Sequence, residues 1–195
     1  MAKVLFDTVK ILWITAITIL VLFLGTLLLQ KGYKQYYSAV YPLQYTAEVT
    51  AASEEFGIEP SLIYAVIHTE SSFRPQATSS ADAKGLMQLT DSTLQWALSR
   101  AGEKGKYTAE DLYDPQVNIH YGVYVLTLLG EQFDNTETIL AAYNAGIGRV
   151  SEWLKNPDYS ADGTHLDEIP YQETKDYVKR VLNARKQYQQ LYNLL

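Results

Sequence analysis

The longest apolar stretch of the chain is uninterrupted by any charge. Residues 11–29, ILWITAITILVLFLGTLLL, are 19 in number, and a helix rising about 1.5 Å per residue would let them nearly span a hydrocarbon core of about 30 Å. The segment that follows, Gln30-Lys31-Gly32-Tyr33, is a poor cleavage site, and no cysteine is present for lipid attachment. The pattern predicts a single uncleaved transmembrane helix rather than a signal peptide or the buried helix of a soluble protein.

After Tyr45 the apolar positions recur at helical spacing, and no segment alternates like a half-buried strand. Gly57, Pro60 and the Gly146–Gly148 segment mark expected helix boundaries. Helices are expected over about 46–56, 60–70, 91–100 (or from Gly85), 115–130, 136–145 and 171–195. The segments 101–115 and 155–170 are expected to be loops. The sequence therefore predicts an all-α domain of six or seven helices over residues 46–195, a juxtamembrane linker over 31–45 and a membrane anchor over 1–30.

One charged residue interrupts the apolar face of the second of these helices. Ile63, Val66 and Ile67 recur at helical spacing, and the next position on that face is Glu70. A buried carboxylate at the C-terminal end of a helix is disfavoured both by desolvation and by the helix dipole, so its pKa should rise. A carboxyl group that stays protonated near neutral pH is suited to general acid catalysis. The alternative is a glutamate that turns into solvent where the helix ends.

Charge and composition exclude several classes of function. Residues 46–195 carry 12 of the 16 basic and 21 of the 22 acidic residues, a net charge of −9, and no basic stripe stands out. Nucleic acid is therefore not an expected partner. The absence of cysteine rules out disulfides and zinc–thiolate sites. Three histidines (His68, His120 and His165) lack metal-binding spacing, and Gly146-Ile147-Gly148 lacks the third glycine of a dinucleotide loop, so no metal or cofactor is expected.

Four separated motifs carry a family resemblance. They are Glu70-Ser71-Ser72-Phe73, Gly85-Leu86-Met87-Gln88-Leu89, Ala141-Ala142-Tyr143-Asn144-Ala145-Gly146, and Ile169-Pro170-Tyr171 with Glu173-Thr174 and Tyr177-Val178. In this order and spacing the chain resembles the catalytic domain of the soluble lytic transglycosylase (SLT) family over residues 50–185. The resemblance implies a lysozyme-like helical fold and cleavage of peptidoglycan.

The resemblance also assigns roles to individual positions. Glu70 matches the single catalytic acid of the family, and Ser79 matches a serine that contacts the bound sugar. The remaining matches to substrate-binding positions are Gln88, Tyr143, Asn144, Glu173 and Tyr177. Tyr143 could instead be an ordinary core residue, and Trp96 and Trp153 are expected in the core rather than as sugar platforms.

The reaction implied by the resemblance needs only one carboxyl group. Glu70 would protonate the glycosidic oxygen between N-acetylmuramic acid and N-acetylglucosamine. It would then act as the base while the muramoyl 6-hydroxyl attacks the anomeric carbon, which leaves a 1,6-anhydro end. Two alternatives stay open: a hydrolytic muramidase of the same fold that uses water, and a non-catalytic wall-binding or assembly protein.

Two departures from the family pattern lie in the loop beside the expected cleft. The family usually has glycine at the position of Asp82 and an apolar residue at the position of Lys84. In most glycosidases a second carboxylate acts as the nucleophile or activates water. Asp82 is therefore a candidate for that role, and the alternative is a solvated loop aspartate.

The lysines that flank the apolar run give little information about orientation. Lys3 and Lys10 precede the run, and Lys31 and Lys34 follow it, so the positive-inside rule hardly distinguishes the two sides. The expected partners are the membrane, through the N-terminal helix, and peptidoglycan glycan strands. With these two partners, we expect a single-pass protein of the cell membrane whose domain faces the cell wall.

Overall fold

The computed structural model describes residues 2–194. The chain divides into two compact units, of which the first ends at Pro42 and the second begins at Leu43. The first unit is dominated by one helix, α1 (Ala2–Val40), of 39 residues. Its division into an anchor and a linker after residue 30, expected from the sequence, falls within this continuous helix.

The apolar part of α1 exposes its side chains. Residues from Leu12 to Leu29 include many large hydrophobic side chains that are between 44% and 75% exposed. Leu12–Val40 is the one stretch within the described residues that is long and apolar enough to cross a membrane. Near the C-terminal end of α1 the rings of Tyr33 and Tyr37 are tilted against each other with centroids 4.3 Å apart, and the Tyr37 ring is stacked with that of Tyr41, just after the helix, at 6.3 Å.

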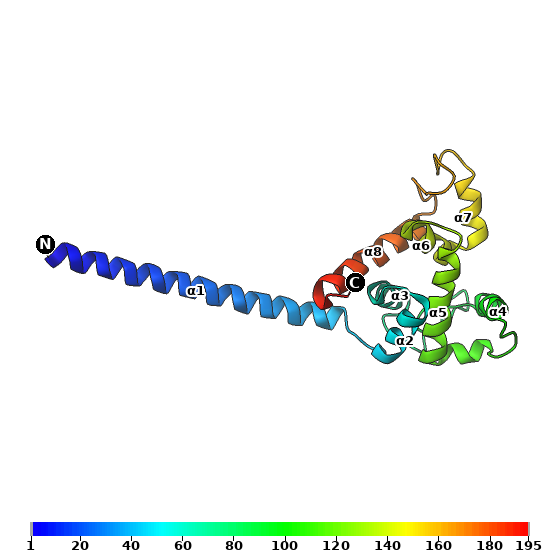
Figure 1. The fold of residues 1–195 in the computed structure, drawn as a ribbon, viewed down its shortest axis with the longest axis horizontal. Coiled ribbons are helices and arrows are strands. Elements are labelled where there is room, and N and C mark those ends of the chain that lie inside the picture. Colours follow the sequence, from blue (N-terminus) through cyan, green and yellow to red (C-terminus); the bar gives the residue numbers. More distant parts are fainter. Residues whose placement is uncertain (1, 195) are drawn as a thin grey trace. The chain divides into compact units, whose positions relative to one another are not determined.

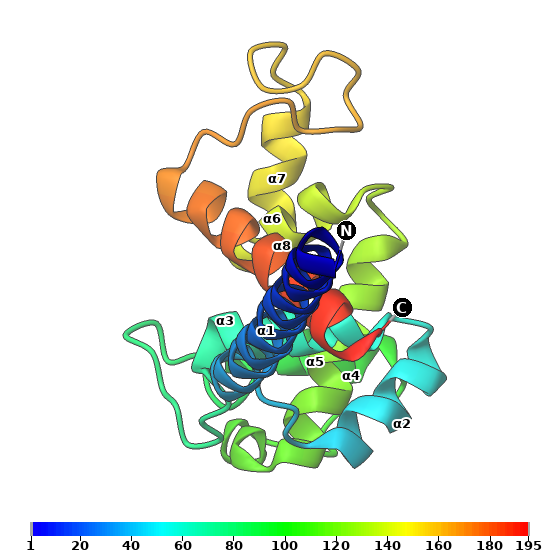
Figure 2. The same cartoon turned by 90° about the vertical axis from the view of Figure 1, so that its left-hand side faces the viewer.

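Every regular element described in the second unit is a helix, and loops join them (Figure 1). Its elements are α2 (Thr46–Phe56), α3 (Pro60–Ser71), α4 (Asp91–Arg100), the 3₁₀ helix η1 (Ala109–Tyr113), α5 (Pro115–Gly130), α6 (Thr136–Ala145), α7 (Ile147–Leu154) and α8 (Gln172–Tyr192). Helix α3 packs against α8 and α2, and α5 packs against α2, α4 and α6. Figure 2 shows α7 and the loop after it at one end of this unit. The expected all-α fold is confirmed.

Local sequence accounts for the helix boundaries. Gly57 ends α2 in the left-handed conformation (φ 69°), and Pro60 occupies the first turn of α3. The side chains of Thr90 and Asn135 cap α4 and α6 by accepting hydrogen bonds from the backbone N–H groups of Thr93 and Thr138. These caps fix where α4 and α6 begin.

Two short helices were not expected from the sequence. Gly146 does end α6, but a new helix, α7, begins at Ile147 and contains Gly148. Its apolar side, which includes Val150 and Trp153, is buried, so packing outweighs the low helix propensity of glycine. The other is η1, which begins with a capping box between Thr108 and Asp111 in the segment predicted to be a polar loop.

Candidate active site

A cleft with a volume of about 450 Å³ lies where the C-terminal ends of α3 and α6 meet the first turns of α4 and α8. Its lining residues are Glu70, Ser79, Ser80, Ala81, Ala83, Gln88, Leu89, Thr90, Thr93, Val125, Tyr143, Asn144, Ala145, Gly146 and Glu173. Six of the seven site residues expected from the sequence are among them. The seventh, Tyr177, is only 2% exposed and lies behind the wall of the cleft, close to Glu70.

Glu70 is an acid of the cleft whose pKa is raised well above its ordinary value. It lies in the last turn of α3, and Ile63, Val66 and Ile67 of the same helix are completely buried. Burial of the carboxyl group raises its pKa from 4.5 to about 7, and smaller effects of the Tyr177 hydroxyl and the Arg180 guanidinium oppose that rise. Glu70 therefore remains largely protonated in mildly acidic solution.

Two tyrosines lie near this carboxyl group. The Tyr143 hydroxyl donates a hydrogen bond to the Met87 carbonyl oxygen at 2.8 Å. The Tyr177 hydroxyl is buried and makes no hydrogen bond of normal geometry within residues 2–194, although it is close enough to Glu70 to affect the pKa of that group. Burial, and then the charge of Glu70, raise the pKa of both tyrosines, so both stay neutral while Glu70 titrates.

Gln88 is presented by a tight turn. Lys84 and Leu89 exchange two backbone hydrogen bonds of 2.8 and 3.1 Å, and Gln88 itself has a φ of 52°. The Gln88 side-chain amide donates to the carbonyl oxygens of Ala77 (3.1 Å) and Gly85 (2.9 Å). A Cβ at Gly85 would collide with the Leu112 carbonyl, so this position requires glycine.

One buried side-chain amide of α5 holds this turn by hydrogen bonds. Asn118 is fully buried, and its Oδ1 accepts a hydrogen bond from the Met87 N–H at 2.7 Å. Its Nδ2 donates to the carbonyl oxygens of Lys84 (2.9 Å) and Leu112 (2.8 Å). No role was assigned to Asn118 from the sequence, although a single amide at a core position of an apolar helix indicates a bonded partner.

Ser79 stabilises the loop that precedes this turn and to which the Gln88 amide is bonded at Ala77. Its Oγ accepts hydrogen bonds from the backbone N–H groups of Ala81 (3.2 Å) and Ala83 (3.1 Å). Because these bonds use the lone pairs of the oxygen, the hydroxyl proton remains available for donation. Ser79 can therefore donate a hydrogen bond to a ligand while it shapes the loop.

Asp82 and Lys84, which depart from the family pattern, form an ion pair with each other. The Lys84 ammonium lies 2.6 Å from Asp82 Oδ1, and the hydrogen bond to Asp82 raises the pKa of Lys84. The Lys84 side chain is 8% exposed, whereas that of Asp82 is 73% exposed and does not line the cleft. Asp82 is thus a surface residue that neutralises a buried lysine. Among residues 2–194, the one acidic residue besides Glu70 that lines the cleft is Glu173, in the first turn of α8.

The remaining candidates lie outside the cleft. Trp153 is buried, as expected, and Trp96 is half-buried and lines a shallow hollow beside the cleft. Within residues 2–194 no three histidine or acidic side chains are grouped as metal ligands. His120 lies 3.4 Å from Glu55 in a separate hollow between α2 and α5 that contains none of the expected site residues.

The second unit is an all-helical domain of the lysozyme-like class, and its cleft contains a buried glutamate whose raised pKa keeps it protonated in mildly acidic solution. A family model described as "Transglycosylase SLT domain" matches residues 48–165. The chain belongs to this family of lytic murein transglycosylases. Tyr171, Glu173 and Tyr177 lie beyond the matched residues.

Individual relatives support the same conclusion. Membrane-bound lytic murein transglycosylase C of Serratia proteamaculans is 32% identical in an alignment of 166 positions that covers 74% of this chain and 46% of the relative. A structure of an inactive glutamate-to-glutamine mutant of lytic transglycosylase Slt from Pseudomonas aeruginosa matches with a TM-score of 0.68 and 34% identity over 78% of this chain and 25% of that one. The 70-kDa soluble lytic transglycosylase of Escherichia coli matches with a TM-score of 0.69 and 30% identity over 79% and 25%. This chain thus spans about half or less of the length of these relatives.

Proposed function

We propose that this protein is a peptidoglycan lytic transglycosylase in which Glu70 is the sole acid and base. The observation that carries the proposal is the position of Glu70, a carboxyl group with a pKa of about 7 that opens onto a 450 Å³ cleft. Membership of the family and the inactive glutamine mutant of the Pseudomonas relative agree with it. The substrate bond is the one between N-acetylmuramic acid and N-acetylglucosamine.

The arrangement of the cleft supports one carboxyl group in two successive roles. Protonated Glu70 gives its proton to the glycosidic oxygen as the bond to the anomeric carbon breaks. The resulting carboxylate takes the proton of the muramoyl 6-hydroxyl as that oxygen attacks the same carbon, so Glu70 ends protonated and no water is consumed. A pKa near the working pH suits a group that must both give and take a proton.

The other expected site residues have supporting roles in this proposal. Ser79 and Gln88 both line the cleft, where their polar groups can bind the hydroxyl and acetamido groups of the sugars. Tyr143 fixes the turn that carries Gln88 through its bond to Met87, and Tyr177 contacts the acid from behind. Asn144 and Glu173 border the cleft at the α6 and α8 ends.

A hydrolytic muramidase remains the second candidate, because one structural observation favours it. Glu173 lines the same cleft as Glu70, and a second carboxylate is the group that activates water in inverting glycosidases. Asp82, which the sequence suggested for this role, is paired with Lys84 instead.

Activity on intact cell wall is the direct test of the proposal. Purified full-length protein in mild detergent should clear a suspension of purified sacculi and release soluble muropeptides. A protein that binds the sacculi, measured by co-sedimentation, but leaves their turbidity unchanged would be a wall-binding protein rather than an enzyme.

We also propose that α1 anchors the protein in the cell membrane, with the second unit on the side of the cell wall. The support is the exposed apolar surface of Leu12–Val40 and the resemblance to a relative named as membrane-bound. Full-length protein should fractionate with membranes at its unprocessed mass, and protein that begins near Tyr45 should be soluble. Recovery of a mature form that lacks residues 1–30 would show that this segment is a signal peptide.

A further inference from the structure

A fixed arginine and an exposed tyrosine lie where α6 turns into α7 and α8 begins. The Arg149 guanidinium lies over the Tyr171 ring, 5.1 Å from its centroid, and Nη1 points at the Ala145 carbonyl oxygen at 3.4 Å. Ala145 lines the cleft, as does Glu173, two residues after Tyr171. The Tyr171 side chain is 50% exposed. The pair therefore lies at the rim of the cleft, in contact with solvent.

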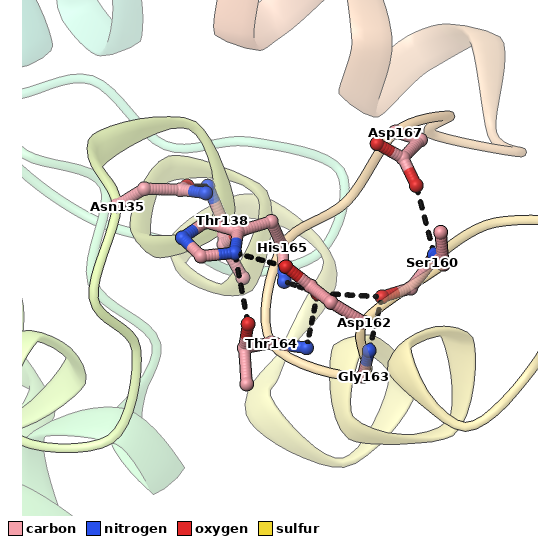
Figure 3. Close-up of polar contacts among 9 residues, drawn as sticks. Asn135, Thr138, Ser160, Asp162, Gly163, Thr164, His165 and Asp167 are labelled. Carbon is pink, nitrogen blue, oxygen red and sulfur yellow. Dashed lines mark hydrogen bonds and ion pairs between the residues drawn. The ribbon is translucent and has the colours of Figure 1, made fainter.

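The Tyr171 ring beneath Arg149 is held in place by Trp153 and by the loop that precedes Tyr171. Trp153, one turn after Arg149 on α7, is buried and meets the Tyr171 ring edge to face at 5.1 Å. The loop that leads to Tyr171 is fixed by its own polar contacts (Figure 3): Asp162 accepts hydrogen bonds from the N–H groups of Thr164 and His165, and Asp167 accepts one from Ala161. Tyr171 thus starts α8 from a defined position.

The charge of Arg149 is not neutralised within the described residues. Six other basic side chains of the second unit pair with a carboxylate: Lys84, Arg100, Lys106, Lys155, Lys175 and Arg185. Two acids near this end of the unit, Glu152 and Glu168, are engaged by Lys155 and Lys175. Arg149 is therefore an oriented cation without a carboxylate partner, on a domain whose net charge is −9.

We propose that Arg149, supported by Tyr171, binds a free carboxylate of the stem peptide that muramic acid carries, at this end of the cleft. The inference rests on the proposed function. The stem peptide supplies the anionic groups of this substrate, and a planar guanidinium matches a carboxylate with two parallel hydrogen bonds. Stacking on the ring restricts the guanidinium before the ligand arrives, which lowers the entropy cost of binding.

The test compares two forms of one substrate. Soluble glycan strands with their stem peptides are used either unchanged or with the peptide carboxyl groups converted to neutral methylamides. Affinity is measured by titration calorimetry in full-length protein carrying Glu70→Gln, which blocks turnover. Unchanged strands should bind about fivefold more tightly than the amidated strands, the size expected for a charged pair at a solvent-exposed site.

The arginine variants decide whether this preference belongs to Arg149. Added to Glu70→Gln, Arg149→Gln should bind both forms equally and at the level of the amidated strand, and Arg149→Lys should keep part of the preference. Arg100→Gln removes the same charge from the end of α4 and should leave the fivefold preference intact. Equal melting temperatures of the variants would confirm that they fold.

Two results would overturn the proposal. One is a fivefold preference that survives in Arg149→Gln. The other is equal binding of both strands by the parent, with a loss for both in Tyr171→Leu, which would make Tyr171 a platform for an uncharged sugar. Failure of the proposed enzymatic function is a separate result, because it would appear as no cleavage by protein with Glu70 intact, whatever the affinities.

Discussion

Glu70→Gln should lower the rate of peptidoglycan cleavage by about 10²–10⁴-fold, the usual loss when a general acid is removed. Glutamine has nearly the same shape as the protonated glutamate, so the cleft and the packing on Ile63, Val66 and Ile67 should be unchanged. It has no proton to donate to the glycosidic oxygen and no carboxylate to receive one from the 6-hydroxyl. The measurement is the initial rate of muropeptide release from sacculi, with circular dichroism as a check of folding.

The same substitution should raise stability in alkaline solution. The ordinary pKa of a glutamate side chain is 4.5 and that of Glu70 in the folded protein is about 7, so between these values the folded state binds more protons than the unfolded state. Stability therefore falls as pH rises through this window and stays lower above it. Glutamine does not titrate, so Glu70→Gln should be more stable than the parent by up to about 3 kcal/mol near pH 8 and by much less near pH 4.

The activity of the parent should depend on whether Glu70 is protonated. It should fall above about pH 7 as Glu70 ionises, with the steepness of one group. Asp82→Asn is the matched control, because it makes the same change of carboxyl to amide in a residue that does not line the cleft. It should keep the rate within about twofold of the parent, because the Asp82 side chain is exposed and lies outside the cleft. A loss at Asp82 as large as that at Glu70 would contradict the assignment.

Asn118→Ala should destabilise the domain by about 3–5 kcal/mol and reduce activity, because it removes a hydrogen bond from each of three buried backbone groups. These are the Met87 N–H and the carbonyl oxygens of Lys84 and Leu112. The turn that they hold presents Gln88, so its displacement deforms one wall of the cleft. Urea unfolding gives the free-energy change, and the rate on sacculi gives the effect on the cleft.

Asn118→Asp keeps the hydrogen-bond acceptor of this side chain and removes its two donors. Aspartate can still accept the Met87 N–H but turns a second oxygen toward two carbonyl oxygens, and it buries a charge. It should be at least as destabilising as alanine at neutral pH and less so in acid, where the carboxyl is protonated. A loss below about 1 kcal/mol for either variant would show that the turn holds its shape without this amide.

Much of the helical framework follows from local signals in the sequence. Gly57, Pro60 and Pro115 mark boundaries within one or two residues of the observed ones, because they restrict or free the backbone directly. Helix α7 was missed because Gly146 and Gly148 indicate an interruption, whereas its stability comes from burying Val150 and Trp153 in a core that the local sequence does not reveal.

The position of Glu70 at the end of an apolar face could be predicted, but the geometry of the rest of the cleft could not. Asp82 was a reasonable second carboxylate by its place in the chain, and only the folded loop shows that it turns out toward Lys84. Arg149 and Tyr171 are 22 positions apart in the sequence, and their contact depends on how the loop between α7 and α8 returns. Pairings of this kind are set by tertiary structure.

The chemical form of the cleaved chain end tests the central proposal most directly. Sacculi digested by the full-length protein in heavy-oxygen water, then analysed by mass spectrometry, should yield muramic acid ends that are lighter by one water than hydrolysed ends. These ends should carry no heavy oxygen and resist borohydride reduction, because the 6-hydroxyl has closed on the anomeric carbon. Reducing ends that contain the heavy oxygen would show that water is the nucleophile, and would make the protein a muramidase with Glu173 as the candidate second carboxylate.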